Sequence, residues 1–302
     1  MKSERRYTFF SVGECNMCKS PVANHKILGK RLNQSQGFKP QTKGGITTSI
    51  YKCDQCDLIY SNPQPRPVNL QDHYGVPPES YWKEEYFNVT ADYFKSEINA
   101  ALRLLENRPS LKSLDIGAGI GKCMVALSNA GFDSYGFEPS QPFYEKAIGR
   151  MGIDNGKLKL ASIETAEYPA DYFDFITFGA VLEHLYDPSS AIVKALRWLK
   201  KDGIIHIEVP SSNWLINKLI NFSYSARLMD YVGNLSPMHE PFHLYEFGLK
   251  SFLHHAEQHQ YRVADHTFYV CDTFLPGALD FVIKPYMRMT KQGMQLCVWL
   301  RK

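Results

Sequence analysis

Short apolar runs alternate with amphipathic stretches from residue 111 onward. The runs have the length and composition of buried strands, and the stretches between them repeat apolar residues at helical spacing. Strands are predicted at residues 113–116, 134–137, 158–161, 173–178 and 203–209, and helices at residues 122–130, 142–151 and 189–200. This alternation predicts an α/β fold in which helices cover a parallel sheet.

The alternation has clear limits on both sides. Ahead of it, apolar spacing predicts a helix over residues 81–106 that ends before Pro109. After Ser211, a stretch rich in aromatic residues and histidine extends to about residue 259. Two further β-like segments follow, at residues 261–270 and 295–301.

A proline-dense stretch divides the chain of 302 residues and is typical of a linker. This length exceeds the ~150 residues of an average domain, which favours one large domain with an added module. The predicted organisation is a module at residues 1–62, a linker at residues 63–80 and a domain at residues 81–302 with a lid insertion around residues 212–245.

The composition is that of an ordinary soluble protein, with 44% hydrophobic and 22% charged residues, and it excludes a wholly disordered chain. No apolar run reaches the ~18–20 residues that span a bilayer. The first residues are polar and charged, without the apolar core of a secretory signal. We therefore expect a cytoplasmic protein without a membrane partner, and the sequence gives no indication of its oligomeric state.

Positive charge is concentrated in the first part of the chain. The net charge is +3 overall, but residues 1–60 contain ten Lys and Arg against four Asp and Glu. Such a basic module can face an anionic partner, such as a phosphate group or a nucleic acid, although a solvated basic surface explains the charge equally.

Four of the seven cysteines fall in two closely spaced pairs, Cys15 with Cys18 and Cys53 with Cys56. Each Cys-x2-Cys pair places two thiolates on one turn, and two such knuckles complete the four-sulfur shell of structural Zn²⁺. A redox-active pair is the alternative. Two pairs in one short module favour structural zinc, with a hairpin and an extended loop between the knuckles.

A glycine loop, Gly117-Ala118-Gly119-Ile120-Gly121, follows the first predicted strand of the alternating part. Glycine lets the backbone turn sharply and approach a ligand closely. Asp115 lies just before the loop, where its carboxylate can accept a hydrogen bond from a ligand ammonium group. Glu138 ends the next strand, where a carboxylate can bind both ribose hydroxyls. Together they suit an adenosine ligand with an amino-acid tail.

These residues, followed by residues 161–164, 173–176 and 181–188, give the chain a resemblance to class I S-adenosylmethionine-dependent methyltransferases across roughly residues 80–302. The resemblance implies a Rossmann-like sheet of seven strands, in which the two late segments form an antiparallel hairpin, and S-adenosylmethionine as cofactor. It also implies a set of cofactor-binding residues: Asp115, Gly117, Ala118, Gly119, Glu138, Ser162, Ile163 and Phe178.

Three histidines are candidates for a general base because the pKa of histidine is near neutrality. His184 follows the fourth strand in a Glu-His pair, and His239 and His243 flank Pro241. A structural or cofactor-side role for His184, and simple packing of the other two, are the alternatives. In quinone and small-RNA O-methyltransferases a metal site lies around this turn. Its first acid corresponds to Ala180, so that site is expected to be incomplete here.

A zinc module ahead of such a methyltransferase resembles the deoxysugar C-methyltransferases and related polysaccharide-locus enzymes. The resemblance implies a small anionic, phosphate-bearing substrate, foremost a nucleotide-linked sugar or polysaccharide precursor. The chain also resembles zinc-containing ribosomal RNA methyltransferases, and this alternative implies RNA as partner. A third hypothesis is a non-catalytic scaffold that binds S-adenosylmethionine.

Overall fold

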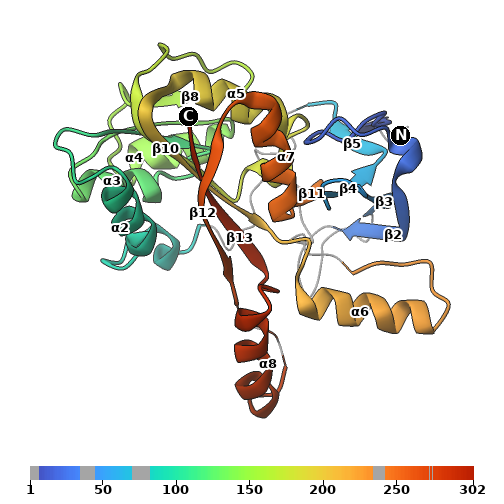
Figure 1. The fold of residues 1–302 in the computed structure, drawn as a ribbon. Helices are drawn as coiled ribbons and strands as arrows, with labels where there is room; N and C mark the ends of the chain where they lie inside the picture. Colours follow the sequence, from blue (N-terminus) through green and yellow to red (C-terminus); the bar gives the residue numbers. More distant parts are fainter. Residues whose placement is uncertain (1–6, 35–44, 70–81, 234–241, 272, 274) are drawn as a thin grey trace. The chain divides into compact units, whose positions relative to one another are not determined.

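The computed structural model describes residues 7–34, 45–69, 82–233, 242–271, 273 and 275–302 (Figure 1). The chain divides into two compact units. Unit 1 contains Met1–Val68, Leu182–Ser189 and Glu208–Val298, and unit 2 contains Asn69–Val181, Ser190–Ile207 and Trp299–Lys302. Residues on both sides of position 62 thus share unit 1, and the division into module, linker and domain stays a prediction.

Seven strands form the larger sheet, in the order β12-β13-β10-β9-β6-β7-β8. They are β6 (Lys112–Ile116), β7 (Asp133–Glu138), β8 (Leu158–Leu160), β9 (Phe173–Gly179), β10 (Leu199–Pro210), β12 (Arg262–Tyr269) and β13 (Gln295–Arg301). Strand β6 pairs in parallel with β7 and β9, and β7 pairs in parallel with β8. The predicted α/β fold with a seven-stranded sheet is confirmed.

The central strands are buried on both faces. In β9 every residue from Phe173 to Phe178 is buried, as expected of a parallel strand that helices cover. The connecting helices are α3 (Lys122–Asn129), α4 (Gln141–Gly149) and α5 (Pro188–Trp198). All strands and helices predicted for this part of the chain are present, although β10 begins earlier than expected, at Leu199.

The long helix predicted ahead of the sheet is wrong in its first half. Within the described residues of 82–106, a 3-10 turn at Glu84–Phe87 is followed by α2, which covers only Lys95–Leu104. Phe94, at the start of α2, has a left-handed backbone with φ +57°. The intervening Asn, Thr and Asp residues favour turns because their side chains compete for backbone hydrogen bonds.

Unit 1 contains an antiparallel four-stranded sheet in the order β11-β4-β3-β2. Its strands are β2 (Lys26–Gln34), β3 (Gly45–Lys52), β4 (Ile59–Asn62) and β11 (Tyr245–Glu246). Strands β2 and β3 form the hairpin expected between the cysteine pairs. A core of Ile50, Ile59 and Val232 lies against this sheet, so residues far apart in sequence build it jointly.

Unit 1 also contains a two-stranded sheet of β1 (Tyr7–Phe10) and β5 (Gln64–Pro67). Strand β5 lies in the predicted linker, of which residues 70–80 lie outside the described part. The predicted lid region contains α6 (Leu215–Ala226), and its function as a lid stays a prediction. Helices α7 (Leu249–His259) and α8 (Gly277–Met289) follow. None of the helices formed by the described residues is long and apolar enough to cross a bilayer.

Candidate functional site

The glycine loop in unit 2 connects β6 to α3 through left-handed backbone. Gly117 has φ +70°, and a Cβ there would lie 2.7 Å from Val181 Cγ2. Gly119 has φ +56°, with no described atom within 4 Å of the position that a Cβ would occupy. The first glycine is thus required by close packing, and the second leaves open space against which a ligand can lie.

Glu138, at the end of β7, holds this loop in place. Its Oε2 accepts a hydrogen bond from the Gly119 N–H and its Oε1 accepts one from the Ser140 N–H, both at 2.8 Å. Burial raises the pKa of Glu138 to about 7, although these two hydrogen bonds lower it. Each carboxylate oxygen has a second lone pair, so ligand hydroxyls can still donate to it.

Asp115, on the neighbouring strand β6, is 4% exposed. Its Oδ2 has no hydrogen-bond partner among the described residues. Burial and the nearby charge of Glu138 raise the pKa of Asp115 to about 8. A buried acceptor without a partner is costly unless a ligand supplies a donor, and a ligand ammonium group would satisfy it.

The other predicted cofactor residues also lie at strand ends of unit 2. Ala118 donates its N–H to the Phe137 carbonyl at 3.0 Å. Phe178 is fully buried and aligns with Ile116 in the sheet. Ser162 begins a turn after β8, and Ile163, 5% exposed, is the second residue of that turn. Their contacts with a cofactor stay predictions.

The four predicted metal ligands of unit 1 lie together. The sulfur atoms of Cys15 and Cys56 are 3.5 Å apart, as are those of Cys18 and Cys53. All four sulfurs lie within 4.8 Å of one another. Thiolates bound to one zinc ion at 2.3 Å lie roughly 3.8 Å apart, so the cluster has the dimensions of a four-sulfur metal site.

Both cysteine knuckles have the same backbone hydrogen bonds. The Cys15 N–H donates to the Ser20 carbonyl and the Cys53 N–H donates to the Leu58 carbonyl, each at 2.8 Å. In both, the residue directly after the second cysteine has a left-handed backbone, with φ +63° and +60°. This repeated turn directs two sulfurs of each knuckle to one point.

Helix α7 fixes the second cysteine of each knuckle. Ser251 Oγ donates to the Cys56 carbonyl at 2.8 Å, and Gln258 Nε2 donates to the Cys18 carbonyl at 3.1 Å. The cysteine cluster is therefore supported by a helix near the other end of the chain. Nothing in the sequence pattern indicated this support.

Two of the predicted catalytic histidines lie side by side in unit 1. The rings of His184 and His243 have centroids 4.7 Å apart and are inclined at 71°. His243 Nε2 lies 3.8 Å from Glu183 Oε1, and the three residues offer ligand atoms within 4.8 Å of one another. The third predicted histidine, His239, lies outside the described residues.

The surroundings of this cluster determine its protonation. His184 Nδ1 lies 3.2 Å from the Phe242 carbonyl oxygen. A carbonyl oxygen only accepts, so Nδ1 carries the proton and Nε2 is the basic nitrogen. Glu183 is 1% exposed. Burial, and then the charge of Glu208, raise the pKa of Glu183 to about 8. The cluster thus combines an imidazole base with a buried carboxyl group.

The same cluster could hold a metal ion through one carboxylate and two imidazoles. The metal site expected by resemblance used two acids and one histidine, with the first acid at Ala180. Ala180 has no ligand atom, and its backbone is left-handed with φ +56°. That expected site is therefore incomplete, while His243 adds a donor that the sequence had not placed beside His184.

The profile of a methyltransferase domain matches residues 90–266, more than half of the chain. The chain belongs to this methyltransferase domain family. Its domain is of the class I, S-adenosylmethionine-dependent type.

Sequence relatives of this methyltransferase domain are distant. An uncharacterized methyltransferase of Bacillus subtilis, YcgJ, is 27% identical over 131 residues, which is 40% of this chain and 52% of that protein. A ubiquinone biosynthesis O-methyltransferase of Methylococcus capsulatus is 26% identical over 125 residues, 40% of this chain and 48% of that protein. The chain thus spans about half the length of the curated relatives it matches.

Solved methyltransferases are similar at lower identity. An S-adenosylmethionine-dependent methyltransferase from Mesorhizobium loti superposes with a TM-score of 0.48 and 12% identity, over 72% of this chain and 100% of that chain.

The residues of the methyltransferase loop fit S-adenosylmethionine. The partnerless Oδ2 of Asp115 can accept from the ammonium group of the methionine part. The open space at Gly119 leaves room for the ligand. Glu138, buried beside the loop, has lone pairs left for ribose hydroxyls.

One further histidine of the methyltransferase is a buried packing residue. His255 of α7 is fully buried. Its Nε2 lies 2.8 Å from Ser189 Oγ and its Nδ1 lies 2.9 Å from the Tyr261 hydroxyl. Burial lowers the pKa of His255 to about 3, so this residue packs as a neutral ring.

Proposed function

We propose that this chain transfers a methyl group from S-adenosylmethionine to a hydroxyl of a small anionic metabolite, foremost a nucleotide-linked sugar or polysaccharide precursor. The observation that carries the proposal is the pairing of His184 and His243 beside Glu183. A hydroxyl is a poor nucleophile, and its attack on a methyl group benefits from a base that removes its proton.

In this proposal His184 Nε2 accepts the proton of the acceptor hydroxyl. Hydrogen bonding of Nδ1 to the Phe242 carbonyl keeps the ring in the tautomer that can do so. His243 packs edge-on against the same ring, and Glu183 lies beside both histidines. Because burial raises the pKa of Glu183 to about 8, this carboxyl group stabilises the protonated ring by charge only at higher pH. The sulfonium of bound S-adenosylmethionine supplies an already activated methyl group.

The substrate class is supported by charge and by resemblance. The basic residues 1–60 favour an anionic partner, and a zinc module ahead of a methyltransferase is typical of the sugar enzymes to which the sequence has a resemblance. The curated O-methyltransferase relative favours oxygen as the accepting atom. The metabolite itself is left for the assay to identify.

We infer that the four cysteines bind one structural Zn²⁺. The sulfur–sulfur distances fit a tetrahedral shell, and four thiolates leave no position for a substrate or water. Three of these cysteines are fully buried, so the ion would act on folding rather than on the reaction.

The test is a methyl-transfer assay with S-adenosylmethionine against a panel of nucleotide-linked sugars. For the accepted sugar, His184→Gln should lower kcat by roughly 10²- to 10⁴-fold, the range of a general base. The affinity for S-adenosylhomocysteine should be unchanged. His254→Gln, which alters a partly exposed histidine of α7, is the matched control and should keep full activity.

Two results would contradict the proposal. Full activity of His184→Gln and His243→Gln would remove the base from the mechanism. Absence of transfer to any sugar, together with copurified RNA whose binding weakens steeply with salt, would favour the RNA methyltransferase reading.

A further inference from the structure

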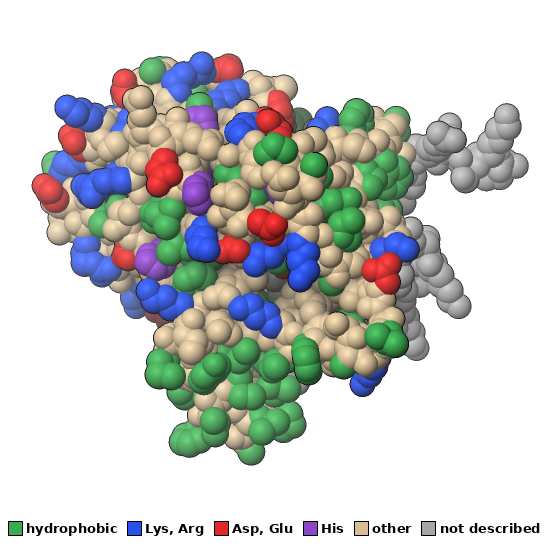
Figure 2. Space-filling view, turned by 45° about the vertical axis from the view of Figure 1, so that its right-hand side comes forward, with side chains coloured by type: hydrophobic (Ala, Val, Ile, Leu, Met, Phe, Trp, Pro, Cys, Tyr) green, Lys and Arg blue, Asp and Glu red, His purple; other side chains and the backbone are tan. Residues whose placement is uncertain are grey.

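Exposed large hydrophobic side chains gather on two helices of unit 1. Of the eighteen such side chains among the described residues, ten belong to α6, α8 and the residues just after α6. We call these ten the helix-pair surface: Leu219, Ile220, Phe222, Leu228, Met229, Leu279, Phe281, Val282, Tyr286 and Met289. Figure 2 shows green side chains gathered at the lower end of the view, where α8 lies in Figure 1.

Helix α8 is apolar on two sides. Its inner side contributes Met287, which is fully buried, to a cluster with Trp214 and Ile216 of the α6 region. Its outer side carries a second stripe at three- and four-residue spacing: Leu279, Val282, Tyr286 and Met289. Because the inner side already provides the packing that the helix needs, the outer stripe is explained by an external partner.

The charges around this surface are mainly positive. Four exposed basic side chains border it and form no ion pair with a carboxylate among the described residues: Lys218, Arg227, Arg288 and Lys291. The two acids of the same segments are already paired, Asp230 with Lys30 at 3.4 Å and Asp280 with Lys284 at 3.0 Å. The partner is therefore expected to be anionic as well as apolar.

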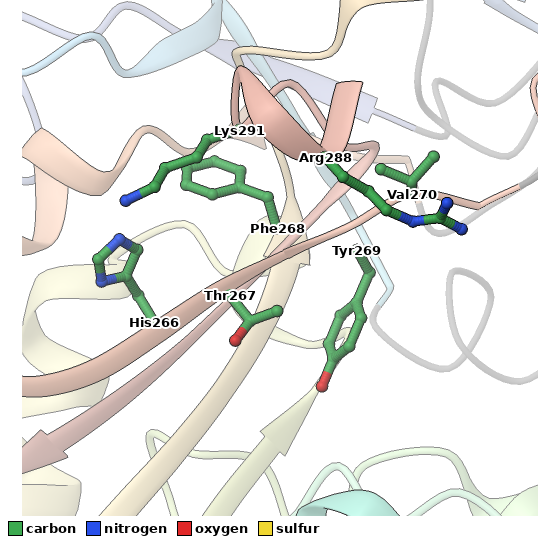
Figure 3. A pocket seen from close by; sticks show the side chains of 7 residues that line it. All are labelled: His266, Thr267, Phe268, Tyr269, Val270, Arg288 and Lys291. Carbon is green, nitrogen blue, oxygen red and sulfur yellow. The ribbon is translucent and has the colours of Figure 1, made fainter. Parts of the chain in front are cut away.

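Two of these cations line a cavity of about 510 Å³ beside α8 (Figure 3). Arg288 and Lys291, at the end of the helix, face it together with Thr267 and His266 of β12. Figure 3 shows the Lys291 ammonium on the side of His266 and the Arg288 guanidinium pointing to the opposite side, so each cation can bind a separate phosphate group. The cavity lies at the end of α8, the helix whose outer side carries the apolar stripe.

In contrast to the expectation from the sequence of no membrane partner, we propose that the helix-pair surface docks on a lipid bilayer with anionic headgroups. The outer stripe enters the boundary between headgroups and acyl chains, and the four cations lie at the level of the phosphates. A second copy of this chain fits less well. A two-fold symmetric contact would bring the same cations against each other. The proposal does not depend on the identity of the methyl acceptor.

The test is flotation of the full chain with vesicles of phosphatidylcholine alone and of phosphatidylcholine mixed with phosphatidylglycerol. Wild type should float with the mixed vesicles only, and salt should weaken its binding. Phe281→Asp should reduce partitioning by roughly ten- to a hundredfold, because an apolar ring no longer enters the bilayer. Arg288→Gln and Lys291→Gln should each reduce it roughly fivefold.

Matched controls lie elsewhere on the chain. Leu253→Asp alters an exposed leucine of α7 outside the helix-pair surface, and Lys201→Gln removes an exposed lysine of unit 2. Both should float like wild type. The proposal fails if wild type does not float, or if it binds neutral vesicles equally well. A different result would assign the surface to a second copy of the chain. In that case vesicles would not bind, and sedimentation without lipid would show a dimer that Phe281→Asp dissociates.

Discussion

The side-chain amide of Asn16 donates a hydrogen bond to the main-chain carbonyl of Tyr186 at 3.1 Å. Asn16 lies between the first two cysteines of the cluster, and Tyr186 closely follows His184 in sequence. The hydroxyl of Tyr245 donates to the same carbonyl at 3.2 Å. The cysteine knuckle therefore holds the segment that carries the candidate base, which gives the N-terminal module a second function besides its own folding.

We expect Asn16→Ala to slow methyl transfer without loss of the metal. The segment around Tyr186 would lose one of the hydrogen bonds that hold it, and a small displacement of a catalytic group can lower the rate by roughly a hundredfold. The measurement is kcat for the accepted substrate, with zinc content and S-adenosylhomocysteine affinity determined on the same sample. Asn24→Ala, an exposed asparagine in the same part of the chain, should change none of the three. An unchanged kcat in Asn16→Ala would show that the hydrogen bond is only structural.

Replacement of one cysteine of the cluster should release the metal and destabilise unit 1. In Cys53→Ser, three thiolates remain, and the site no longer provides the four sulfurs that a structural zinc ion requires. Metal analysis of the purified protein and thermal unfolding would measure both effects. Cys271→Ser, which alters a partly buried cysteine outside the cluster, should keep its metal. If wild type contains no zinc, the proposed site is wrong.

The buried carboxyl of Asp115 should make cofactor binding depend on pH. Burial and Glu138 raise the pKa of Asp115 from 3.8 to about 8. Below about pH 8 the unliganded protein keeps this proton, whereas a bound ammonium group favours the carboxylate. Affinity for S-adenosylhomocysteine should therefore rise by up to about tenfold per pH unit towards pH 8 and then level off.

The same raised pKa of Asp115 predicts how the stability of the unliganded protein depends on pH. The folded state binds a proton that the unfolded chain has released, so the contribution of Asp115 to stability falls as pH rises from 3.8 to about 8. Calorimetric titrations at several pH values would measure how the affinity for S-adenosylhomocysteine changes with pH, and urea unfolding would measure how the free energy of unfolding changes with pH. Asp115→Asn should make both quantities less dependent on pH, although Glu138, whose pKa is raised to about 7, leaves a smaller dependence. Equal slopes in both proteins would contradict this assignment.

The larger sheet could be predicted because each of its strands has a local residue pattern that indicates where the strand lies in the fold. The run Phe173–Gly179 is rich in Phe and Ile and is buried from Phe173 to Phe178, as expected of a strand that is covered on both faces. The helix before the sheet could not be predicted as well, because apolar spacing continues through residues that form a turn. The left-handed Phe94 has no signal in the sequence, since φ > 0 is unusual for a bulky residue.

The candidate site was predictable in its parts but not in its assembly. The spacing of the cysteines indicated a common ligand, because two sulfurs on one turn are a local feature. The approach of His243 to His184 depends on how residues 182–189 pack with residues 242–246 in unit 1. The Leu244 N–H donates to the Glu183 carbonyl at 2.7 Å, and no periodicity encodes such a contact. The burial of His255 is not encoded locally for the same reason, since its partners Ser189 and Tyr261 lie outside its helix.

A buried ion pair that joins β2 to β11 should be sensitive to the loss of one partner. Arg31 Nη2 lies 2.6 Å from Glu246 Oε1, and both side chains are at most 4% exposed. Arg31 also donates to the Gly233 carbonyl at 2.8 Å. Arg31→Met would leave Glu246 buried without its cation and should lower the free energy of unfolding by about 3–5 kcal/mol.

The double variant Arg31→Met/Glu246→Leu should recover most of this loss, because replacing both members of a buried pair with apolar residues is often neutral. Urea unfolding of the zinc-loaded protein measures both variants. Lys95→Met, which breaks the exposed pair with Asp92, should leave the unfolding midpoint unchanged. If the single and double variants were equally unstable, the cost would come from the lost Gly233 contact and packing of Arg31 rather than from the uncompensated charge of Glu246.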